Sequence, residues 1–187
     1  MRLFVAFDLP QDVRDILGEC IARLRQDAVS AKWMRPEALH VTLKFIGHVP
    51  EDMLSRIRAA VEPVRSSAPV EMQFRGIGFF PNDHRPRVIW CGVAASLNLA
   101  SLAADVDAAL EPLGIATESR AFLPHLTLAR FKGPGNIAEL REAASKYRDR
   151  EFGSVRASEF HLFESFLKPS GAEYKNLAAF PFTLGAA

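Results

Sequence analysis

Cysteine is scarce in this sequence, which has only Cys20 and Cys91 among its 187 residues. Two cysteines cannot form the disulfide framework that holds small secreted domains together, and we expect no metal site built on cysteine. Cys20 falls in a helical pattern and Cys91 in an apolar run typical of a strand. We therefore expect two buried thiols in a protein from a reducing compartment.

Long apolar runs are also absent, since no stretch approaches the roughly 20 residues that cross a bilayer. The sequence starts with the strand-like Arg2-Leu3-Phe4-Val5-Ala6-Phe7. This start lacks the basic residues, apolar centre and small-residue cleavage site of a signal peptide. We expect a cytoplasmic protein with no membrane partner.

An excess of charge of either sign is lacking too, because 23 basic residues face 22 acidic ones and the formal net charge is +1. This balance gives no global field that would attract nucleic acid or membranes indiscriminately, so recognition of an anion has to be local. A chain of this length buries roughly 70% of its unfolded surface, which suits one compact unit or two small lobes.

What the sequence does contain is one short motif in two copies. His40-Val41-Thr42-Leu43 recurs 85 residues later as His125-Leu126-Thr127-Leu128. Side chains alternate between the faces of a strand, so each His shares a face with its Thr while the aliphatic residues lie on the other face. Either copy alone fits a half-buried strand with a polar face, but the repetition indicates that each strand brings one imidazole and one hydroxyl to a cleft.

Three other histidines have no matching Thr, and we expect none of them to be catalytic. His48 follows a strand in a Gly-His-Val-Pro turn, His84 lies in a polar loop, and His161 lies in an apolar run. We expect His161 to be a satisfied core histidine.

The motifs belong to a longer repeat, because the same offset aligns Arg2-Leu3-Phe4-Val5 with Arg87-Val88-Ile89-Trp90. Hydrophobic periodicity predicts a strand, a helix, a motif strand, a helix and a strand in each half. The predicted strands are 3–8, 39–46, 70–79, 87–93, 124–131, 155–167 and 172–184, with a short extended piece at 32–34. The predicted helices are 10–28, 51–65, 97–113 and 137–147.

This pattern predicts an α+β fold in which residues 1–187 form a single bilobal domain. Each lobe is expected to be a mainly antiparallel sheet with helices on its outside. The duplicated halves cover approximately residues 1–85 and 86–170, and an extra C-terminal strand follows them. A pseudo-twofold axis between the halves would bring the two motif strands face to face across a central cleft.

These residues resemble those of the two-histidine (2H) phosphoesterases, and within that family the bacterial and archaeal RNA 2′,3′-cyclic phosphodiesterases, also called 2′-5′ RNA ligases. The resemblance spans nearly the whole chain and includes both motifs, the first strand, the block from Phe80 to Trp90 and Phe122-Leu123-Pro124. It implies hydrolysis of RNA 2′,3′-cyclic phosphate ends to 2′-phosphates, with ATP-independent 2′-5′ ligation as related chemistry. It also implies that His40 is the proton donor and His125 the proton acceptor.

The chemistry of these residues supports the same reaction independently of the family resemblance. Opening a cyclic phosphodiester needs a base beside the attacking water, an acid beside the leaving oxygen, and donors for the non-bridging oxygens. Two imidazoles with a pKa of about 6.5 allow one neutral and one protonated ring near neutrality, although the residues alone do not assign the roles. The hydroxyls of Thr42 and Thr127 would hold the phosphate. We expect no cofactor and no metal, because neither His has an Asp, Glu or Cys at ligand spacing and there is no Gly-rich phosphate loop.

Further basic residues near the motifs receive weaker interpretations. Lys44 continues the face of His40 and Thr42, so it would add positive potential at the cleft rim or be simply solvated. Strict alternation places Arg130 on the face opposite His125, so a substrate contact would need a bulge or the end of the strand. The loop arginines receive no site: Arg85, Arg87 and Arg120.

Two other functions fit the same residues. The fold would also suit a module that binds a nucleotide or an RNA end without turnover, although binding alone would not need a matched acid and base. A cyclic-phosphate metabolite would serve as substrate equally well. The partner that we expect is RNA or an oligonucleotide with a 2′,3′-cyclic phosphate end, bound by a monomer.

Overall fold

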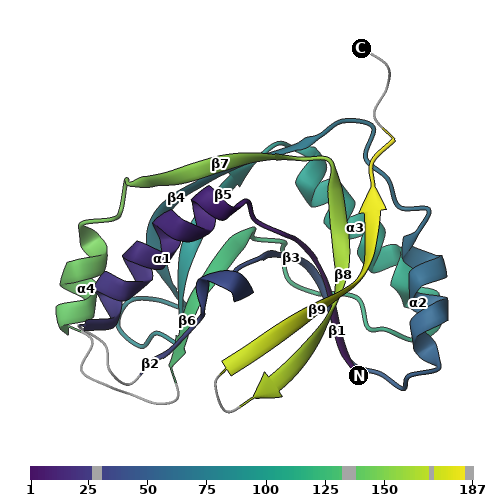
Figure 1. Cartoon of the computed structure of the whole chain (residues 1–187), viewed down its shortest axis with the longest axis horizontal. Helices are drawn as coiled ribbons and strands as arrows, with labels where there is room; N and C mark the ends of the chain where they lie inside the picture. Colours follow the sequence, from purple (N-terminus) through teal and green to yellow (C-terminus); the bar gives the residue numbers. More distant parts are fainter. Residues whose placement is uncertain (27–30, 132–137, 169–170, 184–187) are drawn as a thin grey trace.

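The protein folds into two antiparallel sheets with helices on their outer sides, an α+β architecture, as the computed structural model shows (Figure 1). The structure describes residues 1–26, 31–131, 138–168 and 171–183. Within this part of the chain it has four α-helices, two short 3-10 helices and nine strands. No helix among these residues is long and apolar enough to span a membrane.

One lobe is built on a four-stranded sheet with the strand order β3-β1-β8-β9. Helices α2 and α3 lie on the outer side of this sheet, and α3 packs directly on β3 (Figure 1). The strands are β3 (Val41–His48), β1 (Arg2–Phe7), β8 (Glu159–Lys168) and β9 (Gly171–Pro181), and the helices are α2 (Met53–Val61) and α3 (Asn98–Leu110).

The other lobe is built on a five-stranded sheet with the order β2-β6-β5-β4-β7. Helix α1 packs on β7 and on α4, and α4 packs on β4 (Figure 1). The strands are β2 (Ala31–Trp33), β6 (His125–Phe131), β5 (Val88–Ala95), β4 (Val70–Phe80) and β7 (Glu151–Ala157), and the helices are α1 (Gln11–Gln26) and α4 (Ala138–Ser145).

Alternation along β1 separates the core of the protein from the face that carries the first motif. Leu3, Val5 and Phe7 belong to the main hydrophobic core, which both sheets share with the four helices. Phe4 and Ala6 form a second, smaller apolar cluster. Its other members are Phe163 of β8 and, partly buried, Tyr174 of β9. The sheet is therefore apolar on both faces, and the smaller cluster lies on the side of His40, whose ring meets that of Phe4.

The two sequence halves exchange helices between the lobes. Helix α1 follows β1 of the four-stranded sheet but packs on the five-stranded sheet, whereas α3 follows β5 of the five-stranded sheet but packs on β3 (Figure 1). Strands β4 and β5, which flank the boundary at residues 85 and 86, pair with each other in one sheet. Each lobe is therefore made from both halves of the sequence.

Most predicted elements are present, with two informative differences. The strand expected at 155–167 is two strands, because the chain bends at Ser158 and passes from β7 of one sheet to β8 of the other. The helix expected to reach Arg65 ends at Val61, close to Pro63, which has no N–H to continue a helix. The predicted ends at Ala28, Ile137 and Leu184 lie outside the described residues. Both cysteines are free and buried, as expected.

Candidate active site

The two motif histidines have the same local geometry. His40 lies immediately before β3, and its Nδ1 donates to the carbonyl of Ala38 at 2.9 Å. His125 is the first residue of β6, and its Nδ1 donates to the carbonyl of Leu123 at 2.7 Å. In a neutral imidazole that donates from Nδ1, the lone pair is on Nε2. Each ring thus keeps Nε2 for proton transfer.

Both motif strands contain a β-bulge at the same place. In β3, Thr42 pairs with Ala6 and Lys44 with Val5, which leaves Leu43 as the extra residue. In β6, Thr127 pairs with Trp90 and Ala129 with Ile89, which leaves Leu128 as the extra residue. A bulge shifts the alternation by one residue. As a result, two successive residues are buried after each Thr, and the next residue returns to the face of the His and Thr.

This shift turns Arg130 onto the face of His125 and Thr127, although strict alternation predicted the opposite face. Arg130 is exposed, and its positive charge acts on His40 of the other motif strand, where it lowers the pKa. Strands β3 and β6 also contact each other directly. The two motif strands therefore lie next to each other, and the charge of Arg130 reaches His40 from the neighbouring strand.

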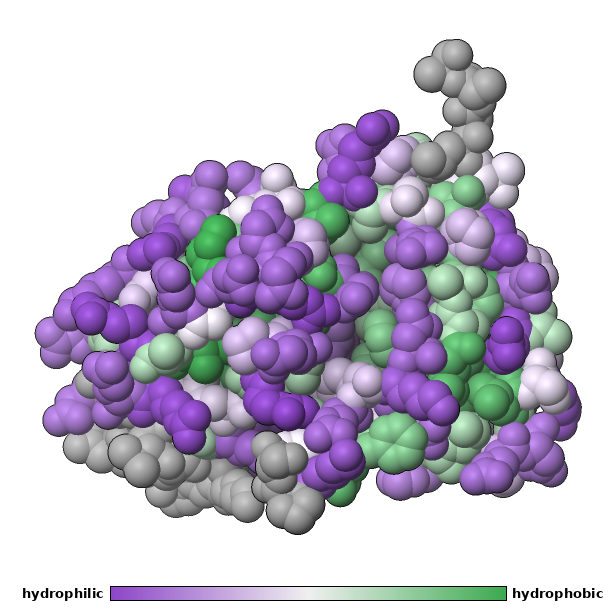
Figure 2. All heavy atoms as spheres, viewed as in Figure 1, coloured by the Kyte–Doolittle hydropathy of each residue, from purple (hydrophilic) through white to green (hydrophobic). Residues whose placement is uncertain are grey.

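The threonines lie where the alternation predicted. Thr42 is opposite Ala6 and Thr127 is opposite Trp90, and both are partly buried. Each hydroxyl is two residues beyond its His on the same face of the strand. The surface is hollowed where the two lobes meet, and hydrophobic atoms show among hydrophilic ones in this hollow (Figure 2).

The ring of His40 is enclosed by two aromatic rings. The centre of the Phe4 ring lies 4.6 Å away, and that of the Tyr174 ring lies 5.0 Å away and nearly perpendicular to the imidazole. Burial lowers the pKa of His40 to about 4, and the carbonyl of Ala38 and the charge of Asp8 only partly oppose it. The ring is therefore neutral at pH 7 in the free protein, which differs from the ordinary pKa that the sequence analysis assumed.

The surroundings of His125 are different. Phe80 of β4 meets the imidazole edge-on at 5.2 Å, and Phe80 packs in turn against Trp90 at 5.1 Å. The indole of Trp90 lies over Gly78, where a Cβ would come within 2.3 Å of the ring. The bare backbone of Gly78 is thus what lets Trp90 lie flat beside Phe80.

Sequence reasoning missed Arg14, which fixes the segment before His40. Arg14 is buried although it lies in α1, and it donates to the carbonyls of Leu9 at 3.1 Å and Pro36 at 2.8 Å. It also forms an ion pair with Asp8. Pro36 begins the 3-10 helix Pro36–Ala38, whose last carbonyl holds the imidazole. An arginine beside Val13 on the apolar stripe of a helix was the available signal.

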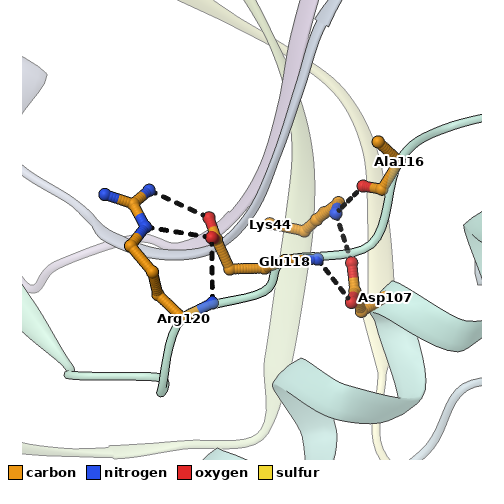
Figure 3. Close-up of polar contacts among 5 residues, drawn as sticks. All are labelled: Lys44, Asp107, Ala116, Glu118 and Arg120. Atoms are coloured by element: carbon orange, nitrogen blue, oxygen red, sulfur yellow. Dashed lines mark hydrogen bonds and ion pairs between the residues drawn. The ribbon is translucent and has the colours of Figure 1, made fainter.

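Lys44 lies at neither of the predicted places. The bulge turns it inward, and it is buried in an ion pair with Asp107 of α3 (Figure 3). Its ammonium also donates to the carbonyl of Ala116 at 2.6 Å, while the carboxylate of Asp107 accepts from the N–H of Glu118 at 3.0 Å. Lys44 therefore links β3 to α3 and to the segment that leads to the second motif.

Arg120 and His161 each have a partner within the protein. Arg120 is exposed and pairs with Glu118 at 3.0 Å (Figure 3). His161 is buried, and the side-chain amide of Asn176 lies 3.0 Å from its Nδ1, which confirms the prediction of a satisfied histidine. Nowhere in the described ranges do three or more His, Cys, Asp or Glu side chains gather in a group that would hold a metal ion.

Comparison with known proteins gives matches over nearly the whole chain. A family model described as the 2′-5′ RNA ligase superfamily matches residues 11–165. The RNA 2′,3′-cyclic phosphodiesterase of Methanothermobacter thermautotrophicus is 37% identical over 181 residues, which cover 96% of this chain and 98% of that protein. The protein of the same name from Archaeoglobus fulgidus is 36% identical over 180 residues, which cover 96% of this chain and 99% of the relative.

Solved structures show the same architecture. The crystal structure of TT0787 of Thermus thermophilus aligns with a TM-score of 0.82 and 32% identity over 100% of both chains. E. coli LigT complexed with 3′-AMP aligns with a TM-score of 0.74 and 24% identity over 97% of this chain and 98% of LigT. At that lower identity the likeness to LigT concerns the fold alone.

Proposed function

The chain belongs to the 2′-5′ RNA ligase superfamily, and from this membership we propose that it hydrolyses RNA 2′,3′-cyclic phosphate ends to 2′-phosphomonoesters. The observation that carries the proposal is the pair of histidines on converging strands, each anchored through Nδ1 to the carbonyl two residues before it. A module that only bound the RNA end would not need two imidazoles with Nε2 kept for protons.

In the proposed reaction, His125 takes a proton from a water molecule whose oxygen attacks phosphorus. The bond between phosphorus and the ribose O3′ breaks, and His40 delivers a proton to that oxygen. The phosphate then remains on O2′. The assignment of His40 as donor and His125 as acceptor follows from the resemblance to the family. Since burial holds the pKa of His40 at about 4, the anionic substrate has to raise it before His40 carries the proton.

Three neutral or cationic groups would hold the phosphate during this step. The hydroxyls of Thr42 and Thr127 approach it from the two motif strands, and the guanidinium of Arg130 adds a positive charge from β6. Donors aimed at the non-bridging oxygens stabilise the charge that develops on them. Arg130 lies close enough to His40 to lower its pKa, so a phosphate beside His40 would also meet the arginine.

The experiment that tests the proposal is a substrate panel with analysis of the product ends. The panel contains the four 2′,3′-cyclic mononucleotides, short RNAs that end in a 2′,3′-cyclic phosphate, and glycerol 1,2-cyclic phosphate as a small metabolite analogue. We expect turnover of the RNA ends with a 2′-phosphate product. The double variant His40→Ala, His125→Ala, purified in the same way, controls for contaminating nucleases.

Other results of the panel would change the proposal. Turnover of the glycerol compound alone would identify a metabolite phosphodiesterase, a 3′-phosphate product would contradict the assigned bond, and binding without turnover would identify a binding module. We further propose a cytoplasmic monomer that works without a cofactor. A related transesterification, in which a ribose 5′-hydroxyl replaces water as the attacking group, the bond between phosphorus and O3′ breaks and no ATP is consumed, would give 2′-5′ ligation and is tested with RNA that carries a free 5′-hydroxyl.

A further inference from the structure

We propose that Tyr174 of β9 is a positioning residue that holds the imidazole of His40 in its working orientation. This inference rests on the proposed function, because it assigns a task to a residue that serves the proposed acid. Tyr174 lies beyond both duplicated halves, so neither motif gave any signal of it. Its strand is the edge strand of the four-stranded sheet and pairs with β8.

Tyr174 contacts His40 as one of three mutually packed rings. The phenol ring lies 5.0 Å from the imidazole at an interplanar angle of 87° and 4.9 Å from the ring of Phe4 at 73°. Phe4 itself lies 4.6 Å from the imidazole. Such edge-on contacts restrict the rotation of a ring as well as adding stability. The carbonyl of Ala38 fixes Nδ1, and the two aromatic rings fix the plane of the imidazole.

The start of β9 is fastened to the segment that carries His40. Arg35, immediately before the 3-10 helix Pro36–Ala38, donates to the carbonyl of Ala172 at 3.2 Å and lies 3.7 Å from the carboxylate of Glu173. The same carboxylate pairs with Lys168 at 2.5 Å. Tyr174 is the next residue after Glu173. These contacts tie the start of β9 to the segment before His40, so they fix the position of the phenol relative to the imidazole.

The phenol ring also keeps water away from His40. A tyrosine side chain is neutral at pH 7 and adds no charge to the site, and burial raises the pKa of Tyr174 further. The charged groups that act on His40 come from other elements: Asp8 after β1, Arg14 of α1 and Arg130 of β6. Loss of the ring would leave these charges in place and would let water reach the imidazole, so the pKa of His40 would rise toward its ordinary value.

The decisive comparison is between Tyr174→Phe, which keeps the ring, and Tyr174→Leu, which removes it. With RNA ending in a cyclic phosphate, we expect Tyr174→Leu to lower kcat about 10- to 100-fold with KM within about threefold, because the acid is no longer held in place. Tyr174→Phe should stay within about threefold of the parent in both constants. Phe166→Leu is the matched control, since Phe166 is an exposed aromatic residue on β8 of the same hairpin.

A second measurement does not depend on turnover. Titration of His40 by NMR in the free protein should give a low pKa for the parent, Tyr174→Phe and Phe166→Leu, and a raised pKa for Tyr174→Leu. An unchanged pKa and unchanged kcat in folded Tyr174→Leu would overturn the proposal. A loss in Tyr174→Phe as large as that in Tyr174→Leu would also overturn it, because the hydroxyl would then be the active part. If no substrate turns over, the proposed function fails while the titration still decides the contact.

Discussion

The two motif strands begin alike and then diverge. Both start with an imidazole anchored to the carbonyl two residues before it, and both bulge at the residue after the Thr. After the bulge, β3 buries Lys44 and exposes Phe45, whereas β6 buries Ala129 and exposes Arg130. The repeat therefore preserves the two anchored imidazoles, while the positions after each bulge give the two strands different surroundings.

The segments before the two histidines differ in the same way. The carbonyl that holds His40 belongs to a 3-10 helix fastened by buried Arg14, and the imidazole is enclosed by Phe4 and Tyr174. The carbonyl that holds His125 belongs to Leu123, a residue that is 61% exposed. The first imidazole thus lies in an apolar, braced environment, and the second lies on the more open side of the site.

The largest effect that we expect is a similar loss of turnover when the histidine of either motif strand is removed. His40→Ala and His125→Ala should each lower turnover on the order of 10² to 10⁴, because each removes one of the two proton transfers. The double variant should lose much less than the product of the two losses, since both groups act on one displacement. Steady-state kinetics measures this, with urea unfolding as the control. Near-normal turnover in either folded single variant would remove that His from the mechanism.

The next effect concerns Lys44, which has no charged counterpart because the second strand carries Ala129 at that position. Asp107→Ala leaves the ammonium of Lys44 buried without its carboxylate and should lower the free energy of unfolding by about 3 to 5 kcal/mol. Asp105→Ala on the same helix is the matched control, because Asp105 is exposed. Urea unfolding of both variants gives the comparison. Equal stability would show that the buried pair contributes nothing particular to the fold.

The pair Phe45 and Arg130 tests the different tasks of the strands. Arg130→Gln should cost roughly 1.5 to 3 kcal/mol of transition-state stabilisation, the scale of a hydrogen bond to a charged group. Phe45→Leu should mainly raise KM for nucleotide substrates, because it removes an exposed ring, covered on one face by Arg2 at 5.0 Å, on which a base would stack. Arg120→Gln is the control, because Arg120 is paired with Glu118 at the surface. If Arg130→Gln behaves like Arg120→Gln, the convergence on the phosphate is wrong.

The two motif threonines should contribute equally, in contrast to the residues after the bulges. Thr42→Val and Thr127→Val keep the shape of the side chain and remove the hydroxyl, so each should cost about 1 to 3 kcal/mol of phosphate stabilisation. Values of kcat/KM for the cyclic-phosphate RNA give this cost, and expression should be unaffected. Parental kinetics in both variants would mean that the hydroxyls serve only the strands.

The smallest effect is a shift in the pKa of His40 when an anion binds. In the free protein the pKa is about 4, below that of an unfolded chain, so this group stabilises the fold above about pH 6.5 and the contribution is lost as the pH falls toward 4. Bound inorganic phosphate should raise the pKa by about 1 unit or more, because a negative charge favours the imidazolium. NMR titration with and without phosphate measures the change. A pKa that stays near 4 with phosphate bound would argue against His40 as the acid.

The sequence predicted the parts of the site that depend on local pattern. The period of a strand placed each Thr on the face of its His, and the repeat predicted two equivalent strands. The positions of Lys44 and Arg130 could not be predicted, because each follows a bulge that is set by pairing with β1 or β5. Tyr174 and Arg14 were missed for a related reason. Their contacts with the surroundings of His40 come from distant parts of the chain, which no local periodicity reveals.

Because the lobes exchange helices, the formation of the proposed site depends on the folding of the whole chain. Helix α1 from the first half covers the five-stranded sheet, and α3 from the second half covers the four-stranded sheet. Each sheet is therefore covered by helices from both halves, so contacts between residues far apart in sequence have to form before either lobe is complete, and such contacts slow folding. We therefore expect the arrangement of the two imidazoles to be lost in the same transition as the global fold.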